Sequence, residues 1–333
     1  MQISKTPVAP IRLISTGKAL PSLKVTSAEL DERLSKTAGY VQKRSGLEYR
    51  YHAAADEDQA ELGAAALHEA IRNAGIAAAS IDLLISASAI PAQILPCTAT
   101  HILRASCLPD GTPGFDVNLS CASFVVGMQT AAGFFSQNGP YRRIAVVSSE
   151  LPSRGLNWDD DSALIFGDGA ACAIFESSAP GCGLAACRME SYVRQGDLCS
   201  VRAGGTRRNP VAGMHASDFH FAMDGRKVFK MAALYLKEFQ DELLRQAGCV
   251  LEEIDWVIPH QASHLGIAHA ARLMGIPKEK LINIYAGHGN QVAASIPTAL
   301  HEMFTDGRWQ SGNTLMFIAT AASLSLAGAV MRT

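Results

Sequence analysis

The chain has 333 residues, of which 48% are hydrophobic and 18% charged, and its formal net charge is −2. This near-neutral charge argues against a nucleic-acid binder, and no run approaches the roughly 18 apolar residues that a membrane-spanning helix needs. The length allows a large core and about two domains. Because the N-terminus, MQISKTPVAPIRLIST, lacks a signal-peptide core, we expect a cytoplasmic protein.

Apolar strand-like and amphipathic helix-like segments alternate along the chain, and the polar, glycine-rich stretch 195–218 is expected to be an insertion or active-site loop. The alternation indicates a layered α/β fold with largely buried sheets. We predict helices over 59–75, 122–137, 226–247, 262–274 and 294–305, and strands over 81–88, 143–149, 170–175, 255–259, 281–285 and 314–319.

Two stretches, 68–88 and 241–261, resemble each other. Each reads as a helix ending in Ala-Gly, a short link, and then Ile-Asp opening an apolar strand, with an offset of 254 − 81 = 173 residues. Gly75 and Gly248 fit helix C-caps. A repeat near half the chain length indicates a duplicated domain. The same offset carries Cys121 to residue 294, so both halves place a loop before a helix there.

Eight cysteines lie between Cys97 and Cys249 without a C-x-x-C pair, which predicts neither a disulfide framework nor a zinc site. Cys121 stands before a segment that is apolar on nearly every face, which indicates a buried helix. The positive end of such a helix favours a thiolate and hence a nucleophile. The same position also suits a cysteine that merely fills the core.

His260 follows a predicted strand, where it can point into a cleft or bind backbone. His260 and His264 have a spacing that can bind zinc on a helix, but no third ligand is evident, so we expect no metal. Asn290 can cap a helix or donate a hydrogen bond into a site. The glycines around Asp168 do not form a G-x-G-x-x-G element, which excludes a dinucleotide site there.

Six segments occur together in an order that is specific as a set. They are RSGLEYR at 44–50, DVNLSCASF at 116–124, FGDGAA at 166–171, MDGRKVFK at 223–230, PHQAS at 259–263 and GHGNQVAASIP at 287–297. On these segments the chain resembles the thiolase-fold condensing enzymes, most closely β-ketoacyl-acyl-carrier-protein synthase III. The resemblance implies a five-layer α-β-α-β-α sandwich of two duplicated halves, 1–180 with the cysteine and 181–333 with the histidine and asparagine, as a homodimer.

The resemblance also implies a reaction. Cys121 would take an acyl group from an acyl-coenzyme A or carrier-protein thioester, and no cofactor would be needed. His260 and Asn290 would donate hydrogen bonds to a malonyl thioester during decarboxylation, and the resulting carbanion would attack the acyl group. The backbone N–H groups of Cys121 and Ala322 would stabilise the oxyanion.

The chain departs from the family pattern near the substrate entrance. Tyr40 and Arg44 keep an aromatic ring and a cation, which fit adenine stacking and phosphate contact. Asp160 stands where the family often has arginine, Ser263 opens SHL in place of NLR, and IATAASLSLAG replaces the usual GFGGG ending. Leu95 falls where a bulky residue crosses the dimer and closes the acyl pocket. These changes favour a specialised paralogue over the housekeeping fatty-acid initiator.

Other functions remain open from the sequence. Cys121 could pass its acyl group to an alcohol or amine with His260 as general base, or two acyl chains could condense without initial decarboxylation, although no extra base is evident. The chain could also be a non-catalytic subunit of a condensing heterodimer, but the intact Cys121, His260 and Asn290 argue against this. A redox-sensing cysteine would need a resolving partner, and none is evident from the spacing.

Overall fold

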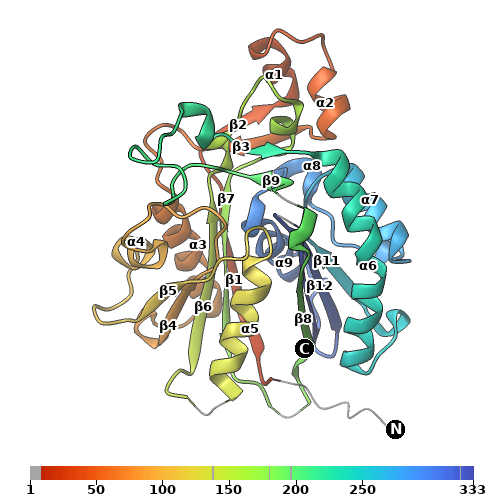
Figure 1. Ribbon diagram of the computed structural model, residues 1–333. Coiled ribbons are helices and arrows are strands. Elements are labelled where there is room, and N and C mark those ends of the chain that lie inside the picture. Colours follow the sequence, from red (N-terminus) through yellow and green to blue (C-terminus); the bar gives the residue numbers. More distant parts are fainter. Residues whose placement is uncertain (1–8, 137–138, 180, 196, 323) are drawn as a thin grey trace.

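The computed structural model describes residues 9–136, 139–179, 181–195, 197–322 and 324–333. Two sheets alternate with three layers of helices, which confirms the predicted α-β-α-β-α sandwich (Figure 1). The first sheet has the order β1 (Arg12–Ala19), β7 (Gly169–Glu176), β6 (Arg143–Glu150), β4 (Leu83–Ser86) and β5 (Gly114–Asp116). The second has the order β11 (Trp256–Pro259), β12 (Thr314–Ala321), β13 (Ser325–Arg332) and β8 (Gly183–Ser191).

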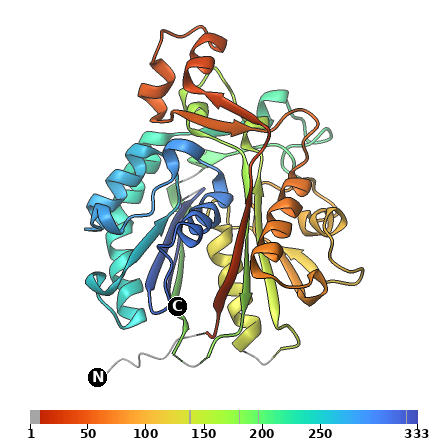
Figure 2. The same ribbon diagram turned by 180° about the vertical axis from the view of Figure 1, so that it is seen from behind.

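The helices fall into outer and central layers. Helices α3 (Gln59–Ala74) and α4 (Thr98–Ala105) cover the outer face of the first sheet, and α6 (Gly225–Ala247) and α7 (His264–Leu273) cover that of the second (Figure 2). The central layer holds α5 (Ser123–Ser136) and α9 (Ser295–Thr305), preceded by the short helix α8 (Tyr285–His288). In the described residues no helix has the length and apolarity needed to cross a bilayer.

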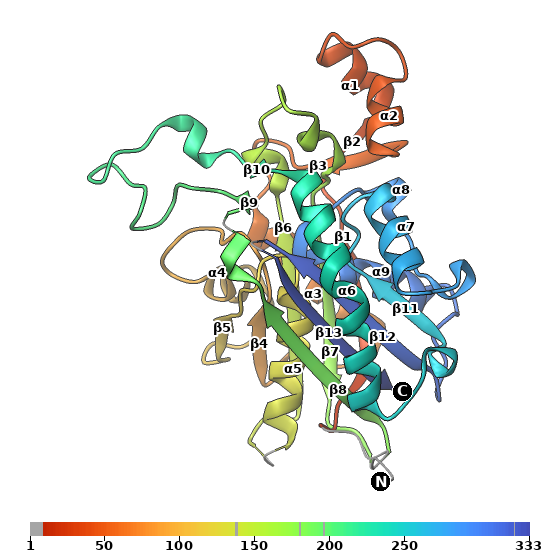
Figure 3. The same cartoon turned by 45° about the vertical axis from the view of Figure 1, so that its right-hand side comes forward.

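Two small ribbons extend from the sandwich. The ribbon of β2 (Leu23–Thr26) and β3 (Tyr49–His52) carries α1 (Ser27–Arg33) and α2 (Tyr40–Ser45) at one end of the molecule (Figure 1). The ribbon of β9 (Cys199–Ser200) and β10 (Ala222–Met223) frames an excursion that reaches away from the body (Figure 3). This excursion corresponds to most of the stretch expected to be an insertion or loop.

The repeated helix-to-strand unit is present in both halves. Helix α3 ends at Gly75 and α6 ends at Gly248, with φ values of 63° and 61°. Glycine adopts this left-handed conformation without the penalty that a Cβ brings. Each helix is followed by a 3-10 turn and a parallel strand, β4 or β11. Pro180, at the predicted boundary between the halves, lies outside the described residues.

The central helices are apolar on most faces because sheets pack against both sides of them. One cluster joins α5 and α9 to both sheets, and it includes Phe124, Met128, Ile296, Leu300 and Met303. The buried polar side chains in the middle of α9, Thr298 and His301, each have a hydrogen-bond partner, because an unpaired one is costly. The free backbone groups at the helix starts are the other places where polar side chains can be paired.

One predicted strand was wrong. The segment 281–285 forms only an isolated bridge between Leu281 and Val257, and α8 begins at Tyr285. The side chain of Asn283 accepts a hydrogen bond from the Tyr285 N–H at 3.1 Å, which turns the chain away from an extended course.

Gly17 allows β1 to lie directly against α3. A Cβ atom added there would stand 2.3 Å from the Ala66 carbonyl oxygen and 2.4 Å from the Ala70 nitrogen. We expect Gly17→Ala to lower the free energy of unfolding by about 1–3 kcal/mol, because backbone must move to admit the methyl group. Urea denaturation measures this change. Gly133→Ala in α5, where nothing lies within 4 Å, is the control and should raise stability by roughly 0.5–1 kcal/mol. Equal stability of Gly17→Ala and the wild type would contradict the close packing.

Candidate active site

The structure brings the loops of Cys121 and Asn290 together. Cys121 lies just before α5 and packs in one apolar cluster with Phe166 and Val292. Asn290 lies on the same segment as Val292, and its backbone N–H donates to the Ile165 carbonyl oxygen at 2.8 Å. Residues from both halves of the chain therefore meet around the thiol.

Glycine makes this meeting possible. A Cβ atom at Gly167 would lie 2.1 Å from the His288 carbonyl oxygen, and one at Gly169 would lie 2.1 Å from the Gln291 amide nitrogen. The Gly167 N–H also donates to the Asn290 carbonyl oxygen at 3.2 Å. Gly167 thus allows close backbone approach between the two halves, and Gly169 makes room for the Gln291 side chain.

Asn290 presents a hydrogen-bond donor to its surroundings. Its Oδ1 accepts a hydrogen bond from the Val292 N–H at 2.9 Å, and a backbone N–H can only donate. The amide is therefore oriented with Nδ2 free of this contact. Asn290 is not the N-cap of α9, because that position is held by Ala294.

His260 joins the same segment through Ser295. Its Nδ1 lies 2.7 Å from the Ser295 Oγ, and the Ser295 hydroxyl in turn lies 2.9 Å from the Val292 carbonyl oxygen. Burial lowers the pKa of His260 to about 4, so its ring is uncharged at neutral pH. An uncharged imidazole is a weak base but still an effective hydrogen-bond donor.

The surroundings of Cys121 oppose the thiolate that the helix N-terminus favours. Burial raises the pKa of the thiol to about 12, and the nearby Glu150 and Cys199 add to the increase. The Ser120 hydroxyl, 3.9 Å from the Cys121 sulfur, acts in the opposite direction. Cys121 stands two residues before Ser123, the first residue of α5.

Glu150 is a site residue that the sequence reasoning missed. It ends β6, is fully buried, and accepts hydrogen bonds from the Ala89 N–H at 2.5 Å and the Ile90 N–H at 3.3 Å. The Ala293 N–H also contributes a hydrogen bond, and burial raises the Glu150 pKa to about 8. Its carboxyl thus ties the loop after β4 to the Asn290 segment. The only signal in the sequence was a single acid closing an apolar strand.

The residues expected at the substrate entrance are bound to an acid. The Tyr40 hydroxyl donates to Asp161 at 2.8 Å, and the Arg44 Nε lies 3.5 Å from the same carboxylate. Arg44 also stands over the Tyr40 ring at 5.4 Å. Asp160 instead caps the following 3-10 turn by accepting from the Ser162 N–H at 2.8 Å. Any phosphate that Arg44 binds must therefore compete with Asp161.

The remaining predicted residues lie in separate places. Leu95 is 81% exposed in the single chain and follows Ile94, which is 69% exposed. Ser263 is the N-cap of α7, where its hydroxyl accepts from the Gly266 N–H at 3.0 Å. Ala322 lies half-buried in the turn after β12, next to Ser323, which is outside the described residues.

His260 and His264 do not share a ligand position. The His264 Nδ1 lies 2.9 Å from the Ser45 carbonyl oxygen, whereas His260 binds Ser295. Their side chains therefore have different partners, as two unrelated structural or functional histidines would.

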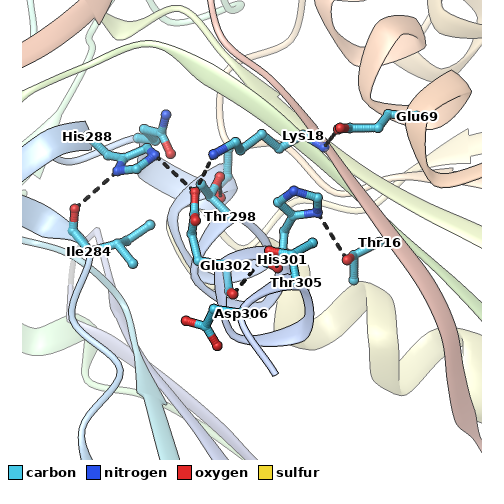
Figure 4. A network of polar contacts seen from close by, with 12 residues as sticks. Thr16, Lys18, Glu69, Ile284, His288, Thr298, His301, Glu302, Thr305 and Asp306 are labelled. Carbon is cyan, nitrogen blue, oxygen red and sulfur yellow. Dashed lines mark hydrogen bonds and ion pairs between the residues drawn. The ribbon is translucent and has the colours of Figure 1, made fainter. Parts of the chain in front are cut away.

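A polar network lies behind the Asn290 segment (Figure 4). Lys18 of β1 forms an ion pair with Glu302 of α9, and the Glu302 Oε1 lies 3.6 Å from the His288 Nε2. The His301 Nδ1 lies 3.1 Å from the Thr16 hydroxyl. Burial lowers the pKa of both histidines, and Lys18 contributes to this. The network joins α9 to β1 of the first sheet.

Comparison with known proteins identifies the class. Residues 115–192 match the family model of 3-oxoacyl-[acyl-carrier-protein (ACP)] synthase III, and 244–333 match that of its C-terminal part. The crystal structure of 3-oxoacyl-[acyl-carrier-protein] synthase III from Aquifex aeolicus VF5 superposes with a TM-score of 0.85 at 28% identity, over 97% of this chain and all of that one. The fold and site therefore define an acyltransferase of the thiolase-fold condensing enzymes.

Full-length relatives give the family. The β-ketoacyl-[acyl-carrier-protein] synthase III of Erythrobacter litoralis is 34% identical over 324 residues, covering 95% of this chain and 97% of that protein. The protein of the same name from Sphingopyxis alaskensis is 33% identical over 323 residues, covering 96% and 98%. The chain belongs to the β-ketoacyl-[acyl-carrier-protein] synthase III family.

Buried uncharged histidines make stability depend on pH. Burial lowers the pKa of His52 to about 4, below the 6.5 of an exposed histidine. The unfolded chain therefore binds a proton first, and stability is lost as the pH falls from about 6.5 towards 4. Between pH 7.5 and 5.5, we expect the free energy of unfolding of His52→Gln to fall by roughly 1 kcal/mol less than that of the wild type. Urea denaturation at the two pH values measures this difference. The same pH dependence in both proteins would refute the assignment.

Glu150 should shape the reactivity of the thiol. At pH 9 its carboxyl is largely ionised and opposes the Cys121 thiolate. We expect Glu150→Gln to speed iodoacetamide labelling of Cys121 by roughly three- to tenfold at pH 9 and to change it little at pH 7. Peptide mass spectrometry measures the rates from pH 6 to 10.

The matched control for this experiment is Asp31→Asn. Asp31 is another buried carboxylate that accepts two backbone hydrogen bonds, from Gly39 at 2.7 Å and Val41 at 2.8 Å. Asp31→Asn should leave the pH dependence of Cys121 labelling unchanged. If the labelling rate of Cys121 in Glu150→Gln matches the wild type at every pH, the proposed effect of the Glu150 charge on the thiol is excluded.

Proposed function

We propose that this enzyme loads an acyl group onto Cys121 and condenses it with a malonyl thioester by decarboxylation. The observation that carries the proposal is that Cys121 and the neutral His260 both contact the segment 290–295, which also holds the oriented Asn290. The chain also belongs to this family. Acyl-coenzyme A or an acyl carrier protein would deliver the substrates, which would place the enzyme in the cytoplasm.

In the first half-reaction the Cys121 sulfur attacks the carbonyl carbon of the acyl thioester. The bond from that carbon to the carrier sulfur breaks, and the proton of the Cys121 thiol ends on the released carrier thiol. The products are acyl-Cys121 and a free carrier thiol. Splitting the transfer in this way replaces one difficult step by two easier ones.

In the second half-reaction the malonyl thioester loses carbon dioxide, and the electron pair of the broken bond forms an enolate. His260 and Asn290 would donate hydrogen bonds to the enolate oxygen. The enolate carbon then attacks the acyl carbonyl and expels the Cys121 thiolate, which takes a proton from solvent water. Removing one such donor typically costs about 2.7–4 kcal/mol of transition-state stabilisation. The backbone N–H groups of Cys121 and Ala322 are proposed to hold the oxyanion of the acyl group.

Asp160 and Asp161, near the expected substrate entrance, affect how well the site can bind a phosphate of the substrate carrier. Arg44 is paired with Asp161, and Asp160 stands where a cation would help to bind phosphate. We therefore propose weaker binding of coenzyme A than the family resemblance alone implies, and a specialised fatty-acid, polyketide or secondary-metabolite pathway. The exposed Ile94 and Leu95 are proposed to be covered by a second copy of the chain in a homodimer.

Acyl loading tests the proposal directly. The protein is incubated with a panel of acyl-coenzyme A thioesters, and intact mass spectrometry follows the added acyl group. We expect a mass gain equal to the acyl group on the wild type and none on Cys121→Ala. Addition of malonyl-coenzyme A should then release carbon dioxide and a β-keto product.

Variants of the two donors separate the half-reactions. His260→Ala and Asn290→Ala should still acquire the acyl label but lose roughly 100- to 1,000-fold in condensation. An acyl label that passes to an alcohol or amine, without release of carbon dioxide, would favour plain acyl transfer. No labelling by any thioester would favour a non-catalytic subunit.

A further inference from the structure

Ser295 contacts the Nδ1 atom of His260 and so bears on which of the two ring nitrogens carries the proton. It is the first residue of α9, is almost fully buried, and its Oγ lies near three groups. The His260 Nδ1 is 2.7 Å away, the Val292 carbonyl oxygen 2.9 Å and the Gln261 backbone nitrogen 3.3 Å. A hydroxyl has one proton to give and two lone pairs with which to accept.

The single proton of Ser295 has two possible destinations. The Gln261 N–H can only donate, so it occupies a lone pair, and the proton goes either to the Val292 carbonyl oxygen or to the His260 Nδ1. In the first arrangement Nδ1 must carry the ring proton, and Nε2 is a lone pair that acts as a base. In the second arrangement Nδ1 accepts, and Nε2 carries the ring proton as a donor.

The surroundings favour the second arrangement. The Val292 carbonyl oxygen already accepts a hydrogen bond from the backbone N–H of Ser295 itself, so it does not depend on the hydroxyl. The contact from the Ser295 Oγ to Nδ1 is also the shortest of the three. Both arrangements give every group around Oγ a partner, so the second partner of the Val292 carbonyl oxygen and the short contact to Nδ1 are the observations that favour the second.

We propose that Ser295 is a positioning residue that donates to the His260 Nδ1 and thereby holds His260 as a hydrogen-bond donor at Nε2. This inference rests on the proposed function and deepens it. A donor at Nε2 suits a thioester whose carbonyl oxygen gains negative charge, as a malonyl thioester does on losing carbon dioxide. It does not suit an alcohol or amine acceptor, which needs a base there.

The same short turn then orients both donors. Val292, which has a positive φ of 50°, donates its N–H to the Asn290 Oδ1, and its carbonyl oxygen lies beside the Ser295 hydroxyl. The turn of Val292–Ala294 therefore fixes Asn290 on one side and, through Ser295, His260 on the other. A hydroxyl lost from this turn should affect condensation more than loading.

The tautomer can be observed directly. Protein labelled with ¹⁵N-histidine gives a long-range ¹H–¹⁵N correlation spectrum at pH 7.5, and the His260 signals are those absent from His260→Asn. We expect a protonated Nε2 and an unprotonated Nδ1. A protonated Nδ1 in the wild type would overturn the proposal, and this reading needs no substrate.

The second test separates the half-reactions in Ser295→Ala. Loading is followed with octanoyl-coenzyme A, or with the panel member that labels the wild type fastest, and decarboxylation with malonyl-coenzyme A. We expect loading within about threefold of the wild type and decarboxylation reduced by roughly ten- to hundredfold, because the ring orientation and tautomer are no longer held. Equal losses in both half-reactions would indicate structural damage and count against the proposal.

The matched control is Thr298→Val on the same helix. The Thr298 hydroxyl is also fully buried, but it donates to the Ala294 carbonyl oxygen at 2.7 Å. It should change neither the His260 tautomer nor the ratio of the two rates. If the wild type decarboxylates no malonyl thioester, the proposed function fails, while the tautomer measurement still decides the role of Ser295.

Discussion

The packing of α5 and α9 between two sheets is the constraint on which the rest of the molecule depends. Helices enclosed on both sides are largely apolar, as the central cluster shows, and the buried Thr298 and His301 of α9 are hydrogen-bonded. Their ends are the places where polar groups can be paired with backbone or with one another. Cys121 before α5 and Asn290 before α9 are therefore where this architecture allows chemistry, and His260 reaches the same place through Ser295.

Burial also decides the charge state of the site. The same low-dielectric surroundings keep the thiol of Cys121 and the ring of His260 uncharged, and they raise the pKa of Glu150. In such a site a fixed hydrogen-bond donor is worth more than it would be in water. This arrangement fits a reaction in which charge forms only briefly on a substrate oxygen better than one that needs a strong base.

Much of the fold was predictable because the periodic spacing of apolar residues indicates its helices and most of the strands of its sheets. All five predicted helices are present to within two residues at each end, since their apolar spacing is strong. The strands β8 and β13 were not predicted, because the small residues of GLAACRMES and SLAGAVMR give little contrast between faces. The segment 281–285 was taken for a strand because a turn formed by Asn283 has no periodic signal.

The site was predictable only in part. Cys121, His260 and Asn290 were singled out because they stand in motifs, whereas the contacts of Glu150 and Ser295 come from residues distant in sequence. The hydrogen bond from Tyr40 to Asp161 joins residues that are 121 positions apart, so no local sequence pattern predicts it. The helix argument for an ionised Cys121 could not include Glu150 or the apolar side chains packed against the thiol, because these come from distant parts of the chain.

The close approach at Gly167 has a consequence for how this site persists through evolution. Where the two halves meet around Asn290, much of the contact is backbone against backbone: the Gly167 N–H on the Asn290 carbonyl oxygen, and the Asn290 N–H on the Ile165 carbonyl oxygen. Backbone contacts place few demands on side-chain identity beyond the absence of a Cβ at one or two positions. The junction that assembles the site therefore leaves most of the surrounding side chains free to vary.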